Sequence, residues 1–426
     1  MVPIVGACAA SQRAYLDHTQ PEPSEPVRSM TSLRGDPLFD ASSLFGDVAT
    51  WHARVVETIA SPGRNLDPMA VAAEDNLYLY GRLLQTYVQS VLLAFRLTGD
   101  LELLDHVDAI AERMRAELRD SWRGTLDGTD GTTDGYLNWV FRQGSDPRYV
   151  GKDTHEMDGM RTHAMIAMIA VALDTNRDLT SPAGGEGAST RYGEHADFWR
   201  DYLVNHFEAK WRDRKNQPTG FPIMTKLIMH TYLSWMKWHY YMGVLTGDAA
   251  YTNEASRMAN IWAGEMRTID TPSGTGYVYP HGVLSLGAVS NFLMPTVYAR
   301  YVFADVVEMH LEGFDQWASA EELRRYSRTF AEIVLDTEDP VANGYSQCIG
   351  GGVERAGLKT LGSLARETAA RYALGGFPQI AAWDATGRVT DFTNAVHNAL
   401  SGTGMMLESG VLLSSVGIVE KYLVSN

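Results

Sequence analysis

The sequence predicts an all-α protein built as an (α/α)6-7 toroid, a closed or incomplete barrel of helical hairpins with one inner and one outer helix each. Two observations predict this fold. A long apolar helix, a short turn and a shorter amphipathic helix recur along the chain, and Leu-Thr-Gly-Asp ends the first helix of two such pairs, at 97–100 and 245–248. A helix that is apolar on all sides is buried, whereas an amphipathic helix lies at the periphery. The pairs therefore predict an inner and an outer ring.

The helical pairs follow one another in chain order. Inner helices are predicted at 76–97, 155–174, 224–245 and 291–311, and their outer partners at 101–118, 191–211, 250–266 and 319–335. Helices at 44–59, 361–383 and 405–423 complete the series. Gly99 and Gly247 stand where a left-handed residue ends a helix, and Asn176 is expected to replace glycine in the second pair. Asp100 and Asp248 can cap the helices that follow.

Composition and charge limit the classes of function. The chain has 426 residues, of which 45% are hydrophobic and 21% charged, as in ordinary globular proteins. A formal net charge of −16 disfavours nucleic-acid binding. No apolar run is long enough to cross a membrane. The two cysteines, Cys8 and Cys348, cannot form a zinc cluster or a disulfide framework.

The chain is expected to contain an extended N-terminal segment, 1–35, followed by a single toroid domain, 36–426. Residues 20–34 are rich in Pro, Ser and Glu. Residues 1–10 resemble part of a signal sequence with a lipobox-like end, although a plain start with a small buried cysteine explains them equally well. The first alternative corresponds to a secreted or periplasmic protein.

The connections between helices differ in length, and this predicts where a site lies. The turns from inner to outer helices are short, whereas the returning connections at 120–153, 212–222, 268–290 and 336–359 are long. Long ordered loops are often functional. They lie at the N-terminal ends of the inner helices, where converging positive helix ends favour an anion. We therefore expect the site at this rim, away from Gly99 and Gly247.

Polar residues stand at the heads of the otherwise apolar inner helices. The candidates are His155, Arg161, Lys226, His230, Asn291, Tyr298 and Arg300. Two loops add aromatic and polar residues of the kind that hold sugar rings: Asn138, Trp139 and Arg142 in one, and Tyr277, Tyr279 and His281 in the other. Structural alternatives stay open. His230 and Tyr298 could be core residues, buried aromatics could simply anchor the loops, and His239, two turns deeper, fits the core better.

The residues at this rim favour one of two reactions. A glycoside hydrolase needs two carboxylates, and the candidates Asp134, Asp153, Glu156 and Asp158 all come from one segment. A uronate lyase needs a base for the proton beside the carboxylate, donors that neutralise the enolate, and an acid for the leaving oxygen. Tyrosine can be that base only where cations lower its pKa. The supply of Tyr, His, Asn, Arg and Lys favours the lyase, provided that the cleft is locally basic despite the overall acidic charge.

With these features the chain resembles the α/α-toroid polysaccharide lyases, most closely family 38, which act on glucuronan or alginate. The resemblance covers about 44–423 and rests on the helix pattern, on His230, Tyr232, His239 and Tyr240 in one inner helix, and on Asn291 and Tyr298 in the next. It implies β-elimination on an acidic polysaccharide, with Tyr298 as the proton-transfer residue, His230 or His239 assisting, and no cofactor or metal. Asn291 and Tyr298, seven residues apart, are expected on one side of their helix.

Other functions remain open on the same fold. A sugar epimerase would use paired histidines, sought among His230, His281 and His397. A glycoside hydrolase would use the carboxylates named above. A carbohydrate-binding protein without catalysis would need the aromatics but not the tyrosine and histidine pair.

Overall fold

The computed structural model describes residues 67–124, 131–142, 147–179, 191–215, 228–288, 291–314, 318–335 and 376–392, with short pieces within 52–59 and 345–356. Several predictions fall outside these residues: the N-terminal segment 1–35, the last helix at 405–423, Lys226 and His397.

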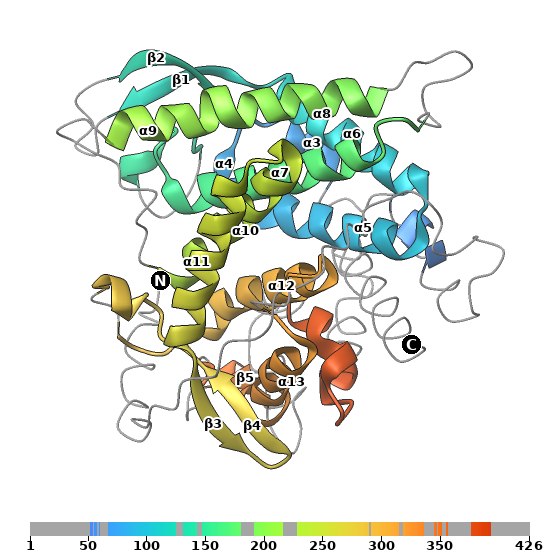
Figure 1. The fold of residues 1–426 in the computed structure, drawn as a ribbon, viewed down its shortest axis with the longest axis vertical. Helices are drawn as coiled ribbons and strands as arrows, with labels where there is room; N and C mark the ends of the chain where they lie inside the picture. The colour runs from blue at the N-terminus through green and yellow to red at the C-terminus, as the bar shows by residue number, and fades with distance from the viewer. Residues whose placement is uncertain are drawn as a thin grey trace.

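The described part of the chain is mostly helical, which confirms the all-α class (Figure 1). It contains four helical pairs in chain order: α5 (Gln85–Thr98) and α6 (Leu101–Arg115), α7 (Glu156–Thr175) and α8 (Arg191–Tyr202), α10 (Met229–Thr246) and α11 (Ala249–Glu265), and α12 (Thr296–Leu311) and α13 (Ala320–Arg328). Short helices α3 (Pro68–Ala72), α4 (Leu77–Leu79) and α9 (Ala209–Lys215) adjoin them. In place of the end of the helix predicted at 361–383, the structure has the 3-10 helix η10 (Phe377–Trp383).

The first helix of each pair is the buried one, as its apolar sequence predicts. α7 and α10 are buried along nearly their whole lengths and pack against each other. α7 also contacts α5, and α10 also contacts α12. In the described part of the chain, three π-helical segments interrupt or extend the helices: η3 (Tyr80–Leu84) before α5, η6 (Leu203–Glu208) between α8 and α9, and η9 (Thr329–Val334) after α13.

Where the structure describes the segments predicted as long loops, it has three two-stranded antiparallel ribbons. They pair β1 (Arg119–Gly124) with β2 (Gly131–Asn138), β3 (Arg267–Thr271) with β4 (Gly274–Val278), and β5 (Tyr345–Ser346) with β6 (Arg355–Ala356). The long connections predicted at 120–153 and 268–290 therefore contain regular strands, which the sequence pattern did not predict. A two-stranded ribbon gains its stability from packing on neighbouring helices, and β4 indeed contacts α13. The sequence of these loops by itself cannot show that β4 contacts α13.

The turns between inner and outer helices follow the predicted chemistry in two pairs. Gly99 and Gly247 are left-handed, with φ of 68° and 70°. Asp100 and Asp248 each accept a hydrogen bond from the second backbone N–H of the next helix, at 2.9 and 2.8 Å. The prediction for Asn176 is wrong, because its φ is −107°. Its side-chain amide instead donates to a carbonyl of the last turn of α7, at 2.7 Å.

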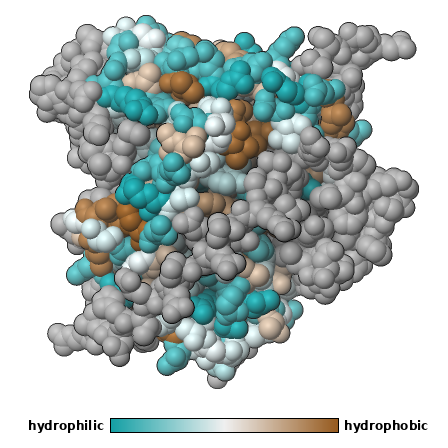
Figure 2. Space-filling view, in the orientation of Figure 1, coloured by the Kyte–Doolittle hydropathy of each residue, from teal (hydrophilic) through white to brown (hydrophobic). Residues whose placement is uncertain are grey.

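On the face seen in Figure 2, teal side chains alternate with white ones and with separate brown patches. Val150 and Leu286 are the large apolar side chains that remain exposed among the described residues. Within the same residues, no helix combines the length and the apolar character that a bilayer crossing requires.

Candidate active site

The heads of the inner helices carry most of the predicted site. His155 is the N-cap of α7, which is the start predicted for this inner helix. Its Nδ1 accepts a hydrogen bond from the backbone N–H of Asp158 at 3.4 Å. The His155 ring also stacks on Phe141, with 4.3 Å between centroids. α10 begins at Met229, five residues later than predicted, because the backbone before it forms a bridge to Gly282.

α12 also begins five residues later than predicted, at Thr296. Pro295 precedes the helix, and a residue before a proline avoids helical dihedrals. Asn291 therefore lies exposed in an extended segment outside the helix. The prediction that Asn291 and Tyr298 share one side of a helix is wrong, and Tyr298 instead lies in the first turn of α12.

The structure brings His230, Tyr298 and His281 together. The rings of His230 and Tyr298 are stacked, with 4.8 Å between centroids and 4° between planes. The His281 centroid is 5.7 Å from His230 and 5.8 Å from Tyr298. His230 is buried, whereas Tyr298 and His281 are partly exposed. The predicted equal depth of His230 and Tyr298 on neighbouring inner helices is confirmed.

Both histidines of this group are neutral at pH 7. Burial lowers the pKa of His230 well below its ordinary value, and repulsion from His281, when that ring is protonated, and from Arg161 and Arg82 acts in the same direction. Burial lowers the pKa of His281 to about 4. Among the described residues, no hydrogen-bond partner reaches Nδ1 of either ring. A neutral imidazole nitrogen in this state can accept a proton or a hydrogen bond from a ligand.

Tyr301 lies one turn beyond Tyr298 and is surrounded by three arginines, which we call the arginine cluster: Arg82, Arg161 and Arg300. The guanidinium carbons of Arg161 and Arg300 are 3.2 and 4.2 Å from the centre of the Tyr301 ring. Arg300 also donates a hydrogen bond to the Tyr301 hydroxyl. Burial by itself raises the pKa of Tyr301, but the three cations outweigh it, and the pKa is lowered.

Tyr301 and Arg82 were not among the predicted site residues. The available signal was the spacing of three between Tyr298 and Tyr301, which places both on one helical face. That spacing cannot show that Arg82, more than two hundred positions earlier, faces the same ring.

The arginine cluster is held by contacts between the α7 helix and the π-helical segment η3. Arg82 Nε donates to Asp158 Oδ1 at 3.0 Å. Arg161 Nε donates to the Gly81 carbonyl at 2.5 Å, and its Nη2 donates to Gln85. π-helical turns often occur at functional sites, and here the turn brings the Gly81 carbonyl within reach of Arg161.

The loop aromatics predicted to hold sugar are core residues. Trp139 is fully buried beside Trp199 and Tyr202, and its indole N–H donates to a backbone carbonyl. Tyr279 is fully buried against Trp262 and Tyr326. Tyr277 is also buried, and its hydroxyl accepts a hydrogen bond from Arg325 at 2.9 Å. The alternative that these aromatics anchor their loops therefore fits the structure.

Three other predicted residues also have structural partners. Asn138 is buried, and its side-chain oxygen accepts a hydrogen bond from Tyr202. Arg142 pairs with Asp75 at 2.5 Å. His239 stacks on Trp235, with 5.3 Å between centroids. His239 follows His230 by nine residues, so it lies on the opposite face of α10, and it cannot replace His230 in the group with Tyr298.

Three of the four carboxylates proposed for a hydrolase, Asp134, Asp153 and Asp158, pair with cations. Arg214 binds both Asp134 and Asp153, each at 2.9 Å. Lys210, itself fully buried, lies 3.3 Å from Asp153. Asp158 is likewise paired with Arg82, so these three carboxylates are not free.

One group of described residues has the spacing for a metal ion: Asp108, Glu112 and His195, on α6 and α8. Arg191 already occupies this group, with its guanidinium 2.7 Å from Asp108. A divalent ion would have to displace that cation, and the group lies on outer helices rather than with Tyr298.

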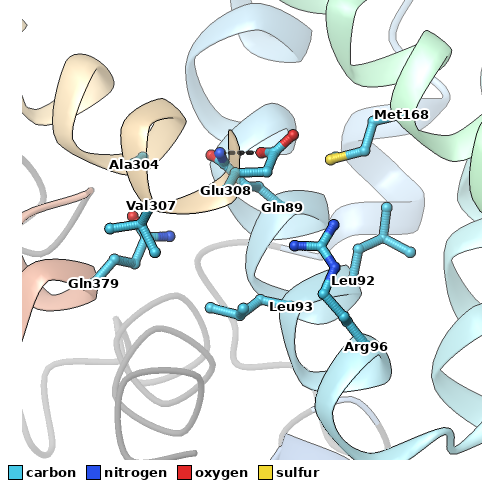
Figure 3. Close-up of a pocket in the computed structure, with 9 residues that line it drawn as sticks. All are labelled: Gln89, Leu92, Leu93, Arg96, Met168, Ala304, Val307, Glu308 and Gln379. Carbon is cyan, nitrogen blue, oxygen red and sulfur yellow. Dashed lines mark hydrogen bonds between the residues drawn. The ribbon is translucent and has the colours of Figure 1, made fainter. Parts of the chain in front are cut away.

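A small cavity lies deeper between the inner helices (Figure 3). Its volume of about 10 Å³ corresponds to a single water molecule. Glu308 in its wall accepts hydrogen bonds from Gln89 and, at 2.8 Å, from Lys237, which also binds Asp305 at 3.0 Å. This cavity is too small for a sugar. Lys237 has a structural role, because it pairs with Glu308.

Comparison of the chain with models of protein families, with curated proteins and with solved structures finds no match.

Proposed function

We propose that this protein is a polysaccharide lyase that cleaves a uronic-acid polymer, glucuronan or alginate, by β-elimination. The observation that carries the proposal is the stacked His230 and Tyr298 pair lying beside the arginine cluster around Tyr301. The same proposal includes a toroid of six or seven hairpins, of which the four described pairs form part, and a secreted or periplasmic location.

The arginine cluster supplies the charge that a uronate needs. Arg161 binds the neutral carbonyl of Gly81 and the amide of Gln85, and among the described residues no partner reaches its Nη1. A buried guanidinium with an unused donor is suited to a carboxylate. The positive ends of α7, α10 and α12 add to the attraction. The site is thus locally basic although the whole chain is acidic.

In this reaction the substrate carboxylate binds at the arginine cluster, which withdraws charge from the neighbouring carbon as the enolate develops. Tyr298 exchanges protons with that carbon and with the leaving oxygen. His230 lies parallel to the Tyr298 ring, and its neutral Nδ1 is able to accept a proton. The bond to the leaving sugar breaks and a carbon–carbon double bond forms in conjugation with the carboxylate.

The test is incubation with glucuronan, alginate and a neutral glucan, followed by ultraviolet absorbance of the unsaturated product. We expect absorbance to rise with one or both uronates and not with the glucan. Tyr298→Phe keeps the ring and removes the hydroxyl, so turnover should fall by about 10²–10⁴-fold. Tyr277→Phe is the matched control, because Tyr277 is buried away from the group with His230. Retention of more than about a tenth of wild-type turnover by folded Tyr298→Phe would exclude Tyr298 as the proton-transfer residue.

A sugar epimerase is the second candidate, favoured by the distance of 5.7 Å between the His230 and His281 rings. Two neutral histidines beside one sugar carbon could remove a proton from it and return one. An epimerase leaves the absorbance unchanged and converts one sugar into its epimer, which nuclear magnetic resonance spectra of the products distinguish from both starting sugar and lyase product.

A further inference from the structure

We infer that Met157 is a positioning residue for His230: its sulfur accepts the Nε2–H of the imidazole and thereby keeps the lone pair of the ring on Nδ1. The inference rests on the proposed function for the use of that lone pair, which is to accept a proton beside Tyr298. It specifies which nitrogen of His230 is the base and which residue determines this.

The first step of the argument is the contact between the two side chains. Nε2 of His230, in the first turn of α10, lies 3.1 Å from the sulfur of Met157, in the first turn of α7. A thioether sulfur has lone pairs but no proton, so it can only accept a hydrogen bond. The proton in this contact therefore belongs to Nε2.

The second step concerns the other nitrogen of the same ring. His230 is buried and neutral, and a neutral imidazole carries one N–H and one lone pair. The hydrogen bond made by one nitrogen determines the state of the other. With the proton on Nε2, the lone pair is on Nδ1. Among the described residues, no hydrogen-bond partner reaches Nδ1, so the lone pair is available to a ligand.

The opposite tautomer is disfavoured at both nitrogens. A lone pair on Nε2 would face the lone pairs of the Met157 sulfur across 3.1 Å. A proton on Nδ1 would be buried without an acceptor among the described residues, because His230 is only 2% exposed. Buried N–H groups without an acceptor are rare in proteins, because the lost hydrogen bond to water is not replaced.

The third step is the orientation of the ring. The ring of Tyr298 lies parallel to that of His230, with 4° between the planes. Stacking fixes the plane of the imidazole, but a rotation of the ring by half a turn leaves the plane unchanged and moves both nitrogens. The contact with Met157 distinguishes these two orientations. Tyr298 and Met157 together therefore determine where the Nδ1 lone pair points.

Nuclear magnetic resonance of protein labelled with ¹⁵N-histidine measures the tautomer without any turnover. A ring nitrogen that carries a proton and one that carries a lone pair resonate in separate regions, and His230→Gln identifies the signals by their loss. We expect Nε2 of His230 to be protonated. His163 is the internal reference, because its Nδ1 lies 2.6 Å from the Gly159 carbonyl, which can only accept, and so should carry the proton. A protonated Nδ1 in neutral His230 overturns the inference.

Met157→Leu tests the positioning role, and Met160→Leu, at a buried position one turn further along α7, is the matched control. Leucine keeps the apolar bulk of methionine but offers no acceptor. Two ring orientations and two tautomers then compete, and one of the four places a lone pair where the wild type has it. We expect kcat to fall by up to about fourfold with KM unchanged, and signals of Nδ1-protonated His230 to appear.

Met160→Leu should keep both the tautomer and kcat of the wild type. A wild-type tautomer or a wild-type kcat in folded Met157→Leu overturns the inference. If Met157→Leu does not fold, Met157→Ala replaces it in the same comparison, because Met157 is partly exposed and its truncation leaves no closed cavity.

These results are separable from the proposed function. A protonated Nε2 that depends on Met157, in a protein that releases no unsaturated product, supports the positioning role and contradicts the lyase. An active lyase whose His230 carries its proton on Nδ1 contradicts the positioning role alone.

Discussion

Gly81→Ala should separate the two elements that hold the arginine cluster. A Cβ at position 81 would lie 2.7 Å from the carbonyl oxygen and 2.9 Å from the Cα of Asp158. Ordinary contacts of this kind begin near 3.4 Å, so η3 and α7 must move apart by about 0.7 Å at this point. The obstructing atoms belong to the backbone and cannot turn aside as a side chain would.

The expected loss of stability follows from this displacement. Overpacking of a core costs about 1–3 kcal/mol, and alanine recovers up to about 1 kcal/mol through its higher helix propensity. We expect a net loss of about 1–2 kcal/mol in the free energy of unfolding, measured by urea denaturation. Lyase turnover should fall as well, because the Arg161 to Gly81 hydrogen bond and the Arg82 to Asp158 pair both cross the contact.

Gly159→Ala is the matched control for this change. Gly159 lies next to Asp158 in α7, and no atom lies within 4 Å of the position of its Cβ. Alanine there should leave stability unchanged or raise it by up to about 1 kcal/mol. If Gly81→Ala is as stable and as active as Gly159→Ala, the close approach of η3 and α7 does not hold the site together, and the reasoning is refuted.

Lys237→Met should lower the free energy of unfolding by about 3–5 kcal/mol in urea denaturation, because it leaves the buried carboxylates of Asp305 and Glu308 without their cation. As a control, Arg257→Met removes an exposed ion pair and should cost no more than about 1 kcal/mol. Asp248→Ala should cost about 0.5–2 kcal/mol through loss of a helix cap, and Asp248→Asn much less. Burial opposes the charge on His195, but the hydrogen bond to Asp108 raises its pKa. His195 should therefore stabilise the fold below about pH 6.5 and lose that contribution as pH rises through the raised pKa. Melting temperatures of the wild type and His195→Asn should converge at high pH; a constant difference contradicts this.

The amino-acid sequence determined the features that depend on near neighbours in the chain. Helix periodicity identified the buried and the outer helices, because an apolar face of a helix must be covered. Gly99 and Asp100 determined a turn, since left-handed backbone and capping involve only adjacent residues. Counting back from such turns also placed His230 and Tyr298 at one depth, because every residue of a helix advances the chain by the same rise.

Only the tertiary structure determined which side chains lie in the hydrophobic core and which lie in the candidate site. Trp139 and Tyr279 lie in loops whose composition is typical of sugar binding, yet both are buried against tryptophans of outer helices. Conversely, nothing in the sequence distinguishes Arg82 from an ordinary helix residue. In the folded protein, η3 places it beside Asp158 and close enough to Tyr301 to lower the pKa of that tyrosine. Burial and charge at a residue depend on everything packed around it, and here many of those neighbours come from other segments of the chain. The lowered pKa of Tyr301 is therefore a property of the packed molecule, because it exists only when three separate helices place their arginines around one ring.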